Sequence, residues 1–168
     1  MERINRLITN RDYRHYLAYN RKEEENRYFC RHQFEHLVSV ARLTYLLLLE
    51  DGNSAFIGKE AAYAAGLLHD IGRWHQYRFG TEHEETSATL AEPLLEEAGF
   101  NTEENRLIIK AIKQHRLNLE EDTGNRHISP LGKALNRADK LSRLCISCGA
   151  KNECKKISRQ PQKERLIY

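Results

Sequence analysis

The chain has 168 residues, of which 40% are hydrophobic and 30% charged, with only 3 prolines and 9 glycines. This length is enough to bury a core as one domain, and the composition excludes a disordered or collagen-like protein. The net charge of +3 is unevenly spread, because residues 1–28 carry +2, residues 29–131 carry −6 and residues 132–168 carry +7. A basic C-terminal region of this kind suits either simple solvent exposure or phosphate-bearing ligands.

The N-terminal region lacks the apolar stretch of a secretory signal. The longest apolar run, "LTYLLLL" at residues 43–49, is too short to cross a bilayer. Four cysteines in a chain without an export signal indicate a reducing compartment, where thiols or metal ligands are commoner than disulfides. We therefore expect a cytoplasmic protein without a membrane partner.

Apolar residues recur with helical spacing along the chain, and few stretches alternate as strands do, which predicts an all-α bundle of about six helices. The helices are expected over residues 12–19, 29–50, 59–71, 81–99, 102–115 and 129–145, with a polar loop over 116–127. Residues 1–28 are expected to form a helical extension, residues 29–145 the main domain, and residues 146–168 a basic, cysteine-containing tail that packs on that domain or trails from it.

Glycine and proline set the expected ends and breaks of these helices. Gly72 and Gly99 follow the third and fourth helices in the position that a C-terminal glycine prefers. Pro93 lies inside the fourth predicted helix, where its missing N–H should kink or split the helix.

Polar residues mark the positions at which two of the helices are expected to begin. Thr81 with Glu84 three residues later has the pattern of a capping box at the start of the fourth helix. Ser129 and Pro130 stand in the N-cap and first-turn positions that each prefers, and they begin the last helix.

Six polar residues lie on helix faces that should point inward. His36, for example, shares a face with Val40 and Leu47. The dipeptide His69-Asp70 ends the small, apolar run "AAYAAGLL", where an ionised carboxylate is costly unless something pairs with it. The complete set is His36, His69, Asp70, His83, His115 and Asp139.

A lone inward histidine is usually a core residue satisfied by hydrogen bonds, and each of the six alone would suit that interpretation. Together, on separate helices that converge on one core, one or two divalent cations would satisfy them all. Their nitrogen and oxygen ligands suit Fe, Mn, Co, Ni or Zn better than Ca or Mg. The sequence therefore predicts a site for one or two divalent transition metal ions.

The order His36, His69-Asp70, Asp139 resembles the H…HD…D signature of the HD superfamily of metal-dependent phosphohydrolases. The segments "HLVSVARLTYLLL", "AAGLLHDIGRW" and "NRADKLSR" resemble its three anchoring segments, so the likeness covers roughly residues 30–145. It implies an HD-domain helical bundle that hydrolyses phosphate esters or phosphoanhydrides by attack of metal-bound hydroxide.

Within that superfamily the pattern is most similar to the two-metal branch of symmetrical diadenosine tetraphosphate hydrolases. His83 and His115 resemble the additional histidines of HD proteins with two metals, and Asp70 is the natural carboxylate to bridge the ions. Arg73 is a departure, because many members have lysine at that position. The chain also lacks the additional motifs of the cyclic-dinucleotide branch, which argues against that substrate.

His32 competes with His36 for assignment, because it lies four residues earlier and both could face one metal. His36 is favoured since it leads directly into the long apolar stripe. His32 is then expected to support the ligands or to face the substrate.

Three cations lie close to the predicted ligands along the chain and could line the same cleft. Arg73, Arg116 and Lys140 are predicted to contact substrate phosphate, since arginine offers a two-pronged donor and lysine a point charge. A solvated side chain is the alternative for each of them. Asp70 and Lys140 are the predicted catalytic residues.

The segment "CISCGAKNEC" contains Cys145, Cys148 and Cys154, and Cys30 could complete a set of four thiolates if the tail folds back. Complete zinc sites usually show two CxxC pairs, and here there is one. Reduced, packed thiols are therefore the alternative to a structural metal.

The expected function is metal-dependent hydrolysis of a small phosphate-bearing substrate, and a nucleotide is the expected class. Two alternatives are an HD-type diiron oxygenase, which resembles this ligand set, and a regulatory module that binds metal or nucleotide without turnover. No nucleic-acid partner is expected, and a homodimer is left open.

Overall fold

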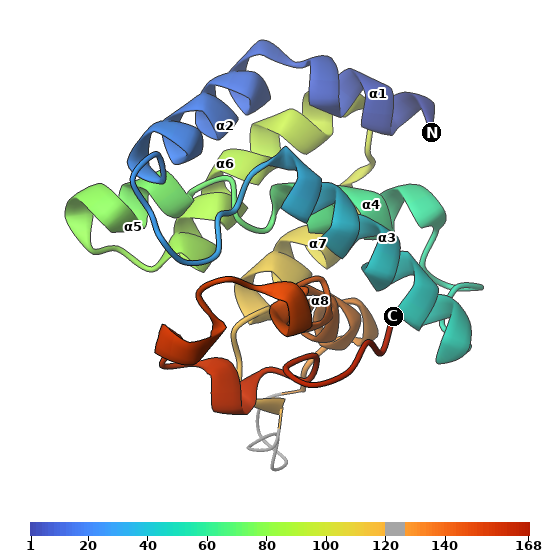
Figure 1. Cartoon of the computed structure of the whole chain (residues 1–168). Helices are drawn as coiled ribbons and strands as arrows, with labels where there is room; N and C mark the ends of the chain where they lie inside the picture. The colour runs from blue at the N-terminus through green and yellow to red at the C-terminus, as the bar shows by residue number, and fades with distance from the viewer. Residues whose placement is uncertain (120–126) are drawn as a thin grey trace.

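The computed structural model describes residues 1–119 and 127–168, and the described residues form eight α-helices and no strand (Figure 1). The all-α fold expected from the sequence is confirmed. Part of the predicted loop over 116–127 lies outside the described residues. The helices are α1 (Glu2–Thr9), α2 (Arg11–Glu23), α3 (Phe34–Glu50), α4 (Lys59–Leu68), α5 (Arg73–Phe79), α6 (His83–Ala98), α7 (Thr102–Gln114) and α8 (Pro130–Leu141).

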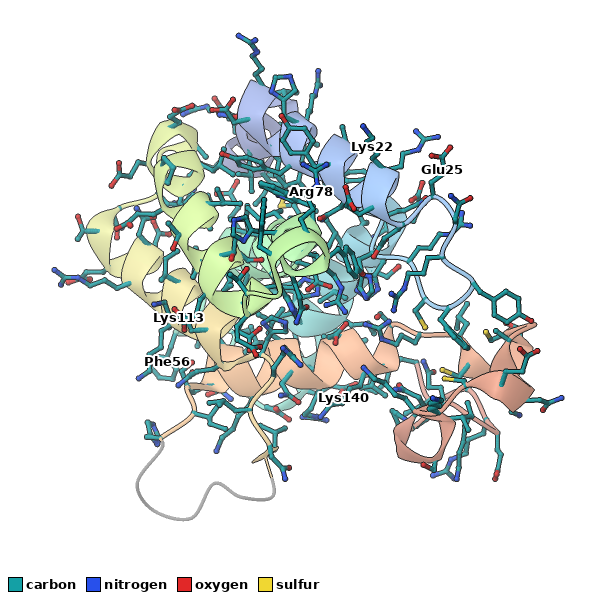
Figure 2. The ribbon with its side chains drawn as sticks, turned by 90° about the vertical axis from the view of Figure 1, so that its left-hand side faces the viewer. Lys22, Glu25, Phe56, Arg78, Lys113 and Lys140 are labelled. Carbon is teal, nitrogen blue, oxygen red and sulfur yellow. The ribbon has the colours of Figure 1, made fainter. Side chains whose placement is uncertain are left out.

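Helices α3, α4, α7 and α8 pack against one another and form the centre of the molecule. Helix α1 lies against α4 and α6, α2 lies against α5, and α6 covers α7, so the N-terminal helices close one side of this centre (Figure 1). Side chains of Leu37, Leu47, Leu68, Ile108 and Leu135 are fully buried between these helices. Charged side chains such as Lys22 and Lys113 extend from the outer surface (Figure 2).

Gly66 permits the closest helix contact in the structure's centre. A Cβ atom at this position would lie 2.3 Å from Cα of Ala41, so α3 and α4 can meet only because residue 66 has no side chain. The alanine-rich sequence of α4 extends this close packing, since Ala61, Ala62 and Ala65 are also buried. The close contact holds the end of α4, where His69 and Asp70 follow, against the His36 helix.

Several predicted helix ends are confirmed. Helix α6 ends at Gly99 with a left-handed φ of 91°, and Ser129 caps α8 by accepting a hydrogen bond from the Gly132 amide at its side-chain oxygen. Helix α6 continues through Pro93 without a break, so the predicted split is wrong.

Two capping predictions are also wrong. No side chain caps the start of α6, because the Thr81 hydroxyl pairs with the His75 ring instead. The capping box in this structure is at Asn101 and Glu104, at the start of α7. Gly72 does not end a helix: it is the N-cap of α5, and a Cβ there would lie 2.6 Å from the Ser87 amide nitrogen.

The tail after α8 contains no α-helix and consists of turns and the short 3-10 helices η2 (Cys145–Ser147), η3 (Lys151–Glu153) and η4 (Ile157–Arg159). Gln162 anchors it, since its buried side chain donates hydrogen bonds to the carbonyls of Leu141 and Arg143. The tail thus returns to the end of α8 (Figure 1).

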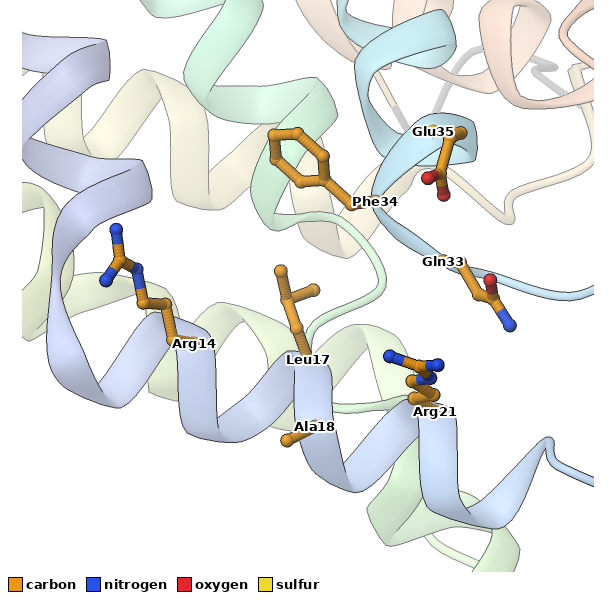
Figure 3. Close-up of a pocket in the computed structure, with 7 residues that line it drawn as sticks. All are labelled: Arg14, Leu17, Ala18, Arg21, Gln33, Phe34 and Glu35. Carbon is orange, nitrogen blue, oxygen red and sulfur yellow. The ribbon is translucent and has the colours of Figure 1, made fainter.

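A surface hollow of about 310 Å³ lies between α2 and the start of α3 (Figure 3). Arg14, Arg21, Phe34 and Glu35 are among its lining residues, and none of the six predicted ligands is. Within the described residues, no helix is both long enough and apolar enough to cross a membrane.

Candidate metal centre

The predicted ligands come from the ends of five helices that meet in the centre of the bundle. His36 is in the first turn of α3, His69 and Asp70 directly follow α4, and His83 begins α6. His115 is the C-cap of α7, and Asp139 lies in the last turn of α8. Because the ligands lie at helix ends, they can meet in the centre while the apolar faces of the same helices pack in the core.

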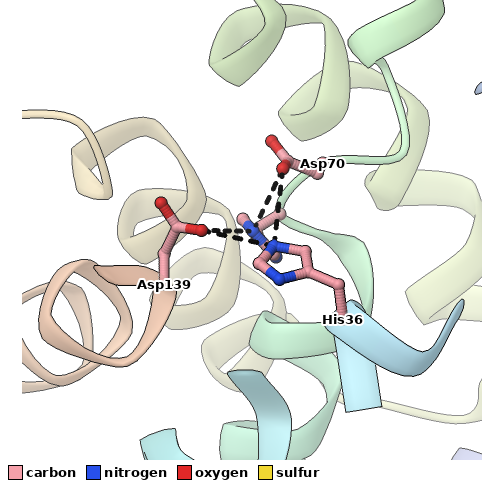
Figure 4. Close-up of side chains that lie close together, drawn as sticks. His36, Asp70 and Asp139 are labelled. Atoms are coloured by element: carbon pink, nitrogen blue, oxygen red, sulfur yellow. Dashed lines mark ion pairs between the residues drawn. The ribbon is translucent and has the colours of Figure 1, made fainter. Parts of the chain in front are cut away.

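The first ligand group consists of His36, His69, Asp70 and Asp139, which each offer one ligand atom within 4.8 Å of all the others. Nε2 of His36 lies 3.3 Å from Oδ1 of Asp139 and 4.0 Å from Oδ2 of Asp70 (Figure 4). Nε2 of His69 lies 3.4 Å from Oδ2 of Asp70 and 3.8 Å from Oδ1 of Asp139. Two imidazoles and two carboxylates thus surround one point.

The second ligand group consists of Asp70, His83 and His115, which are all buried. Nε2 of His83 lies 2.9 Å from Oδ1 of Asp70 and 3.3 Å from Nε2 of His115. Nε2 of His115 lies 3.9 Å from the same carboxylate oxygen.

Asp70 belongs to both groups, and its two oxygens face different ones. Oδ2 faces His36 and His69, whereas Oδ1 faces His83 and His115. A carboxylate can bind one cation with each oxygen, which an imidazole cannot do with its single unprotonated nitrogen. The geometry therefore suits two cation positions that share Asp70.

Hydrogen bonds on the far side of three rings fix the orientation of the ligand atoms. Nδ1 of His69 lies 2.7 Å from the Gly66 carbonyl oxygen, and Nδ1 of His115 lies 2.6 Å from that of Ile112. Nδ1 of His83 lies 2.8 Å from Oε1 of Gln76. Because these oxygens accept, each Nδ1 donates its proton, which leaves Nε2 as the nitrogen that can bind a cation, as metal-binding histidines require.

Two buried imidazole nitrogens without hydrogen-bond partners in the described part of the chain also indicate a bound cation. Nε2 of His36 and Nε2 of His69 are buried and have no hydrogen-bond partner among the described residues. An unsatisfied buried polar atom is costly, and a cation would satisfy both at once. Imidazole nitrogen with carboxylate oxygen is the ligand mixture that iron, manganese, cobalt, nickel and zinc accept.

The charges and pKa shifts of the site also favour a bound cation. Burial opposes the protonation of His69, but the carboxylates of Asp70 and Asp139 raise its pKa to about 10. Burial also opposes the ionisation of Asp70, yet the His69 ring and the Arg73 guanidinium hold the pKa of Asp70 well below its usual value. The centre therefore attracts positive charge strongly, and a metal cation would displace the proton on His69.

A buried network next to the first group includes residues that were not predicted. Nδ1 of His32 lies 2.5 Å from Oε1 of Glu24, and the Tyr77 hydroxyl donates to the same oxygen at 2.7 Å. His32 is not in either ligand group, but its Nε2 lies 3.9 Å from Oδ2 of Asp70. No helical pattern indicates Glu24, because it lies in the polar run "RKEEEN".

The structure brings one of the three predicted phosphate cations to the ligand groups. Nη1 of Arg73 lies 3.0 Å from Nε2 of His83 and 3.3 Å from Oδ1 of Asp70. Arg116 instead pairs with Glu82 and Glu84 on the surface.

Lys140 is exposed and donates to Oδ1 of Asn136 on its own helix (Figure 2). Arg143 is a cation that was not predicted, and its Nη2 lies 2.7 Å from Oδ1 of Asp139. The signal was present in "NRADKLSR", where Arg143 follows Asp139 by one helical turn.

Comparison with known proteins agrees with this geometry. The model of the HD domain family matches residues 33–144, a range that contains every member of both ligand groups. A protein of Clostridium beijerinckii with the name "Uncharacterized protein" is 38% identical over 154 residues, which cover 92% of this chain and 92% of that protein. No solved structure matches the chain.

Proposed function

This chain belongs to the HD domain family, and we propose that it is a metal-dependent phosphohydrolase that acts on a nucleotide or a related small phosphate compound. The family implies metal-dependent hydrolysis. The observation that carries the proposal is the position of Asp70, whose two oxygens face two separate sets of imidazole nitrogens. The resemblance of the sequence to the two-metal branch of symmetrical diadenosine tetraphosphate hydrolases supports the proposed substrate class.

His36, His69, Asp70 and Asp139 would hold one ion, and Asp70, His83 and His115 would hold a second. When bound, such ions polarise a phosphoryl oxygen and make hydroxide available from water at neutral pH. We propose iron or manganese, with cobalt, nickel and zinc as further candidates for the same ligands.

The chain's own residues would bind and orient the substrate. Nη1 and Nε of Arg73 contact Asp70, His83 and the Tyr77 hydroxyl. An ion in the second ligand group would displace Nη1 from Asp70 and His83, and we assign the displaced guanidinium to a phosphate oxygen. Arg116 and Lys140 are exposed and would have to turn from their present partners to reach the same phosphate.

His32 is suited to support the ligands. Glu24 accepts the Nδ1 proton of His32, which leaves an unprotonated Nε2 directed at Asp70. Burial lowers the pKa of His32 to about 4, so the ring is neutral at pH 7 and is too weak a base to hold a released proton. We therefore assign to His32 a positioning role beside Asp70.

The proposal is tested by assaying the protein, loaded with manganese or iron, for phosphate release. The panel should contain nucleoside mono-, di- and triphosphates and symmetrical diadenosine tetraphosphate. We expect hydrolysis that depends on the metal and is abolished by Asp70→Asn. Asp51→Asn is the matched control, because Asp51 is a surface aspartate that pairs with Arg137.

Hydrolysis at the wild-type rate by the folded Asp70→Asn variant would refute the mechanism. Dioxygen consumption by the iron-loaded protein without phosphate release would instead favour the oxygenase alternative. Stoichiometric nucleotide binding without turnover would favour a regulatory module.

A further inference from the structure

The four cysteines form a second cluster of metal-ligating side chains, outside both ligand groups. All four are free thiols: Cys145 is buried, Cys30 and Cys154 are half-buried, and Cys148 is exposed. Burial raises the pKa of the Cys145 thiol, and the neighbouring thiols of Cys30, Cys148 and Cys154 raise it further, so the three cysteines of the tail lie in the same region as one that is more than a hundred residues earlier.

The backbone of the tail turns repeatedly around these residues. The Cys148 amide donates to the Cys145 carbonyl at 3.3 Å, the Lys151 amide donates to the Cys148 carbonyl at 3.1 Å, and the Cys154 amide donates to the Lys151 carbonyl at 3.3 Å. Each turn advances three residues, and η2 and η3 contact each other. A CxxC pair on such a turn is the usual way for a short segment to offer two thiolates to one metal.

Cys30 is held at the tail by contacts on both sides. The Tyr28 hydroxyl donates to Oε1 of Glu153 at 3.2 Å, which joins the segment before Cys30 to η3. Burial lowers the pKa of Arg143, but the neighbouring Asp139 carboxylate and Cys30 thiol raise it above its usual value, so Arg143, which precedes η2, lies close to Cys30.

The tail has little else to hold its shape. Among its described side chains, only Cys145, Ala150 and Gln162 are buried, while Leu144 and Ile146 are exposed. Short segments without an apolar core usually depend on a metal or a disulfide for a defined structure. Over its described residues the tail has neither an apolar core nor a disulfide, so the four free thiols are its available means of cross-linking.

We propose that Cys30, Cys145, Cys148 and Cys154 together bind one structural zinc ion. Four thiolates are a complete tetrahedral ligand set for zinc, with sulfur–zinc bonds of about 2.3 Å. Zinc binding releases the thiol protons to solvent, and the resulting negative charge is offset by Arg143 and by the basic region over residues 132–168.

The sulfur atoms must close in when zinc binds. Among the described residues, the only sets of three or more potential ligand atoms that all lie within 4.8 Å of one another are the two around Asp70. This movement would fall on the turns and short 3-10 helices of the tail, whereas the helices that hold the first and second ligand groups are already in place. The zinc would hold the tail beside the metal centre, because Cys30 is two residues from His32 and Arg143, two residues before Cys145, contacts Asp139.

The test separates this site from the centre at Asp70 and does not depend on hydrolysis. The Asp70→Asn protein is purified under reducing conditions, dialysed against a weak chelator and analysed for zinc. We expect about one zinc per chain, released by a thiol-specific mercurial. Cys148→Ser in the same background should lose this zinc, and so should Cys154→Ser. Ser147→Ala, a change of the exposed neighbour of Cys148, should retain it.

Cobalt provides a second readout. Bound in place of zinc, it should give an intense thiolate-to-cobalt charge-transfer band that imidazole and carboxylate ligands do not give. Retention of one zinc by the cysteine variants, absence of zinc and of the cobalt band in the wild type, a disulfide among the four cysteines, or the visible absorption of an iron–sulfur cluster would each overturn the zinc assignment.

Discussion

Arg73 decides how easily a second ion enters the centre. Its Nη1 lies 3.0 Å from Nε2 of His83 and 3.3 Å from Oδ1 of Asp70, the atoms that the second ligand group offers. A metal would bind the same atoms at about 2.0–2.2 Å, so the guanidinium and the ion cannot occupy this position together. The second ion must therefore displace a half-buried guanidinium from two of its three ligands, whereas, within the described residues, Arg143 contacts only one of the four ligands of the first ion, Asp139.

We accordingly expect one tight and one weaker equivalent of manganese, and we expect Arg73→Ala to tighten the weaker one. A charged hydrogen bond contributes about 1.5–3 kcal/mol, so the gain should be roughly 10- to 100-fold. Competition titration with a chelator measures both affinities. Arg116→Ala, which removes a surface cation next to His115, should leave them unchanged, and an unchanged second affinity in Arg73→Ala would contradict the competition.

His32 gives the fold a dependence on acid. Burial lowers its pKa to about 4, against 6.5 for an ordinary histidine. Between these values the unfolded chain binds a proton that the folded chain does not, so the free energy of unfolding falls as the pH falls from 6.5 to 4. The contribution is about 3 kcal/mol across that window.

His32→Gln should remove this contribution, because glutamine does not titrate but can still donate to Glu24. Urea unfolding of the metal-free protein at several pH values would show a shallower decline for the variant than for the wild type. Equal pH slopes for the two proteins would show that folding does not change the pKa of His32.

At the level of elements, the packing of α3 on α4 sets the position of the HD dipeptide. Gly66→Ala would place a methyl group 2.3 Å from Cα of Ala41 and would move the carbonyl that accepts the Nδ1 proton of His69. Overpacking of this kind costs about 1–3 kcal/mol, measured by urea unfolding. Gly149→Ala is the matched control, since no atom lies within 4 Å of a Cβ there. An equal decrease in the free energy of unfolding for both variants would show that α3 and α4 can move apart without loss of stability.

Helical periodicity predicted the elements that carry an apolar stripe. Helix α7 is an example, because Ile108, Ala111 and Ile112 are all fully buried and mark its inner face. Helix α5 was not predicted, since none of its residues is buried and it has no stripe to detect. The split at Pro93 was wrong because α6 accommodates proline within a helix that is packed on α1 and α7.

The candidate site was predictable where a polar residue interrupts an apolar face, as His36 and His115 do. It was not predictable where the polar residue lies among other polar residues. Glu24 is fully buried and accepts hydrogen bonds from His32 and Tyr77, but its neighbours along the chain are all polar. Its burial results from the packing of the N-terminal segment against α5, a contact between distant residues that local pattern does not encode.

At the level of the whole molecule, the metal centre joins parts of the chain that are far apart in sequence. Its ligand groups span residues 36 to 139 and come from five helices or their ends. The unfolded chain cannot present these atoms together, so an ion that binds the folded state alone adds its binding free energy to the stability of the fold. The increase in stability on adding metal therefore measures metal binding, and this measurement needs no substrate.

We therefore expect manganese to raise the melting temperature of the wild-type protein and to have little effect on Asp139→Asn. At a concentration 100 times the dissociation constant the gain is about 2.7 kcal/mol, or roughly 5–10 °C for a chain of this size. Manganese is the suitable probe because thiolates bind it poorly, so the cysteine cluster contributes little. Asp51→Asn should respond as the wild type does, since Asp51 pairs only with Arg137 at the surface. If Asp139→Asn gains as much stability as the wild type, manganese binds elsewhere, because the first ligand group would have lost one of its two carboxylates without consequence.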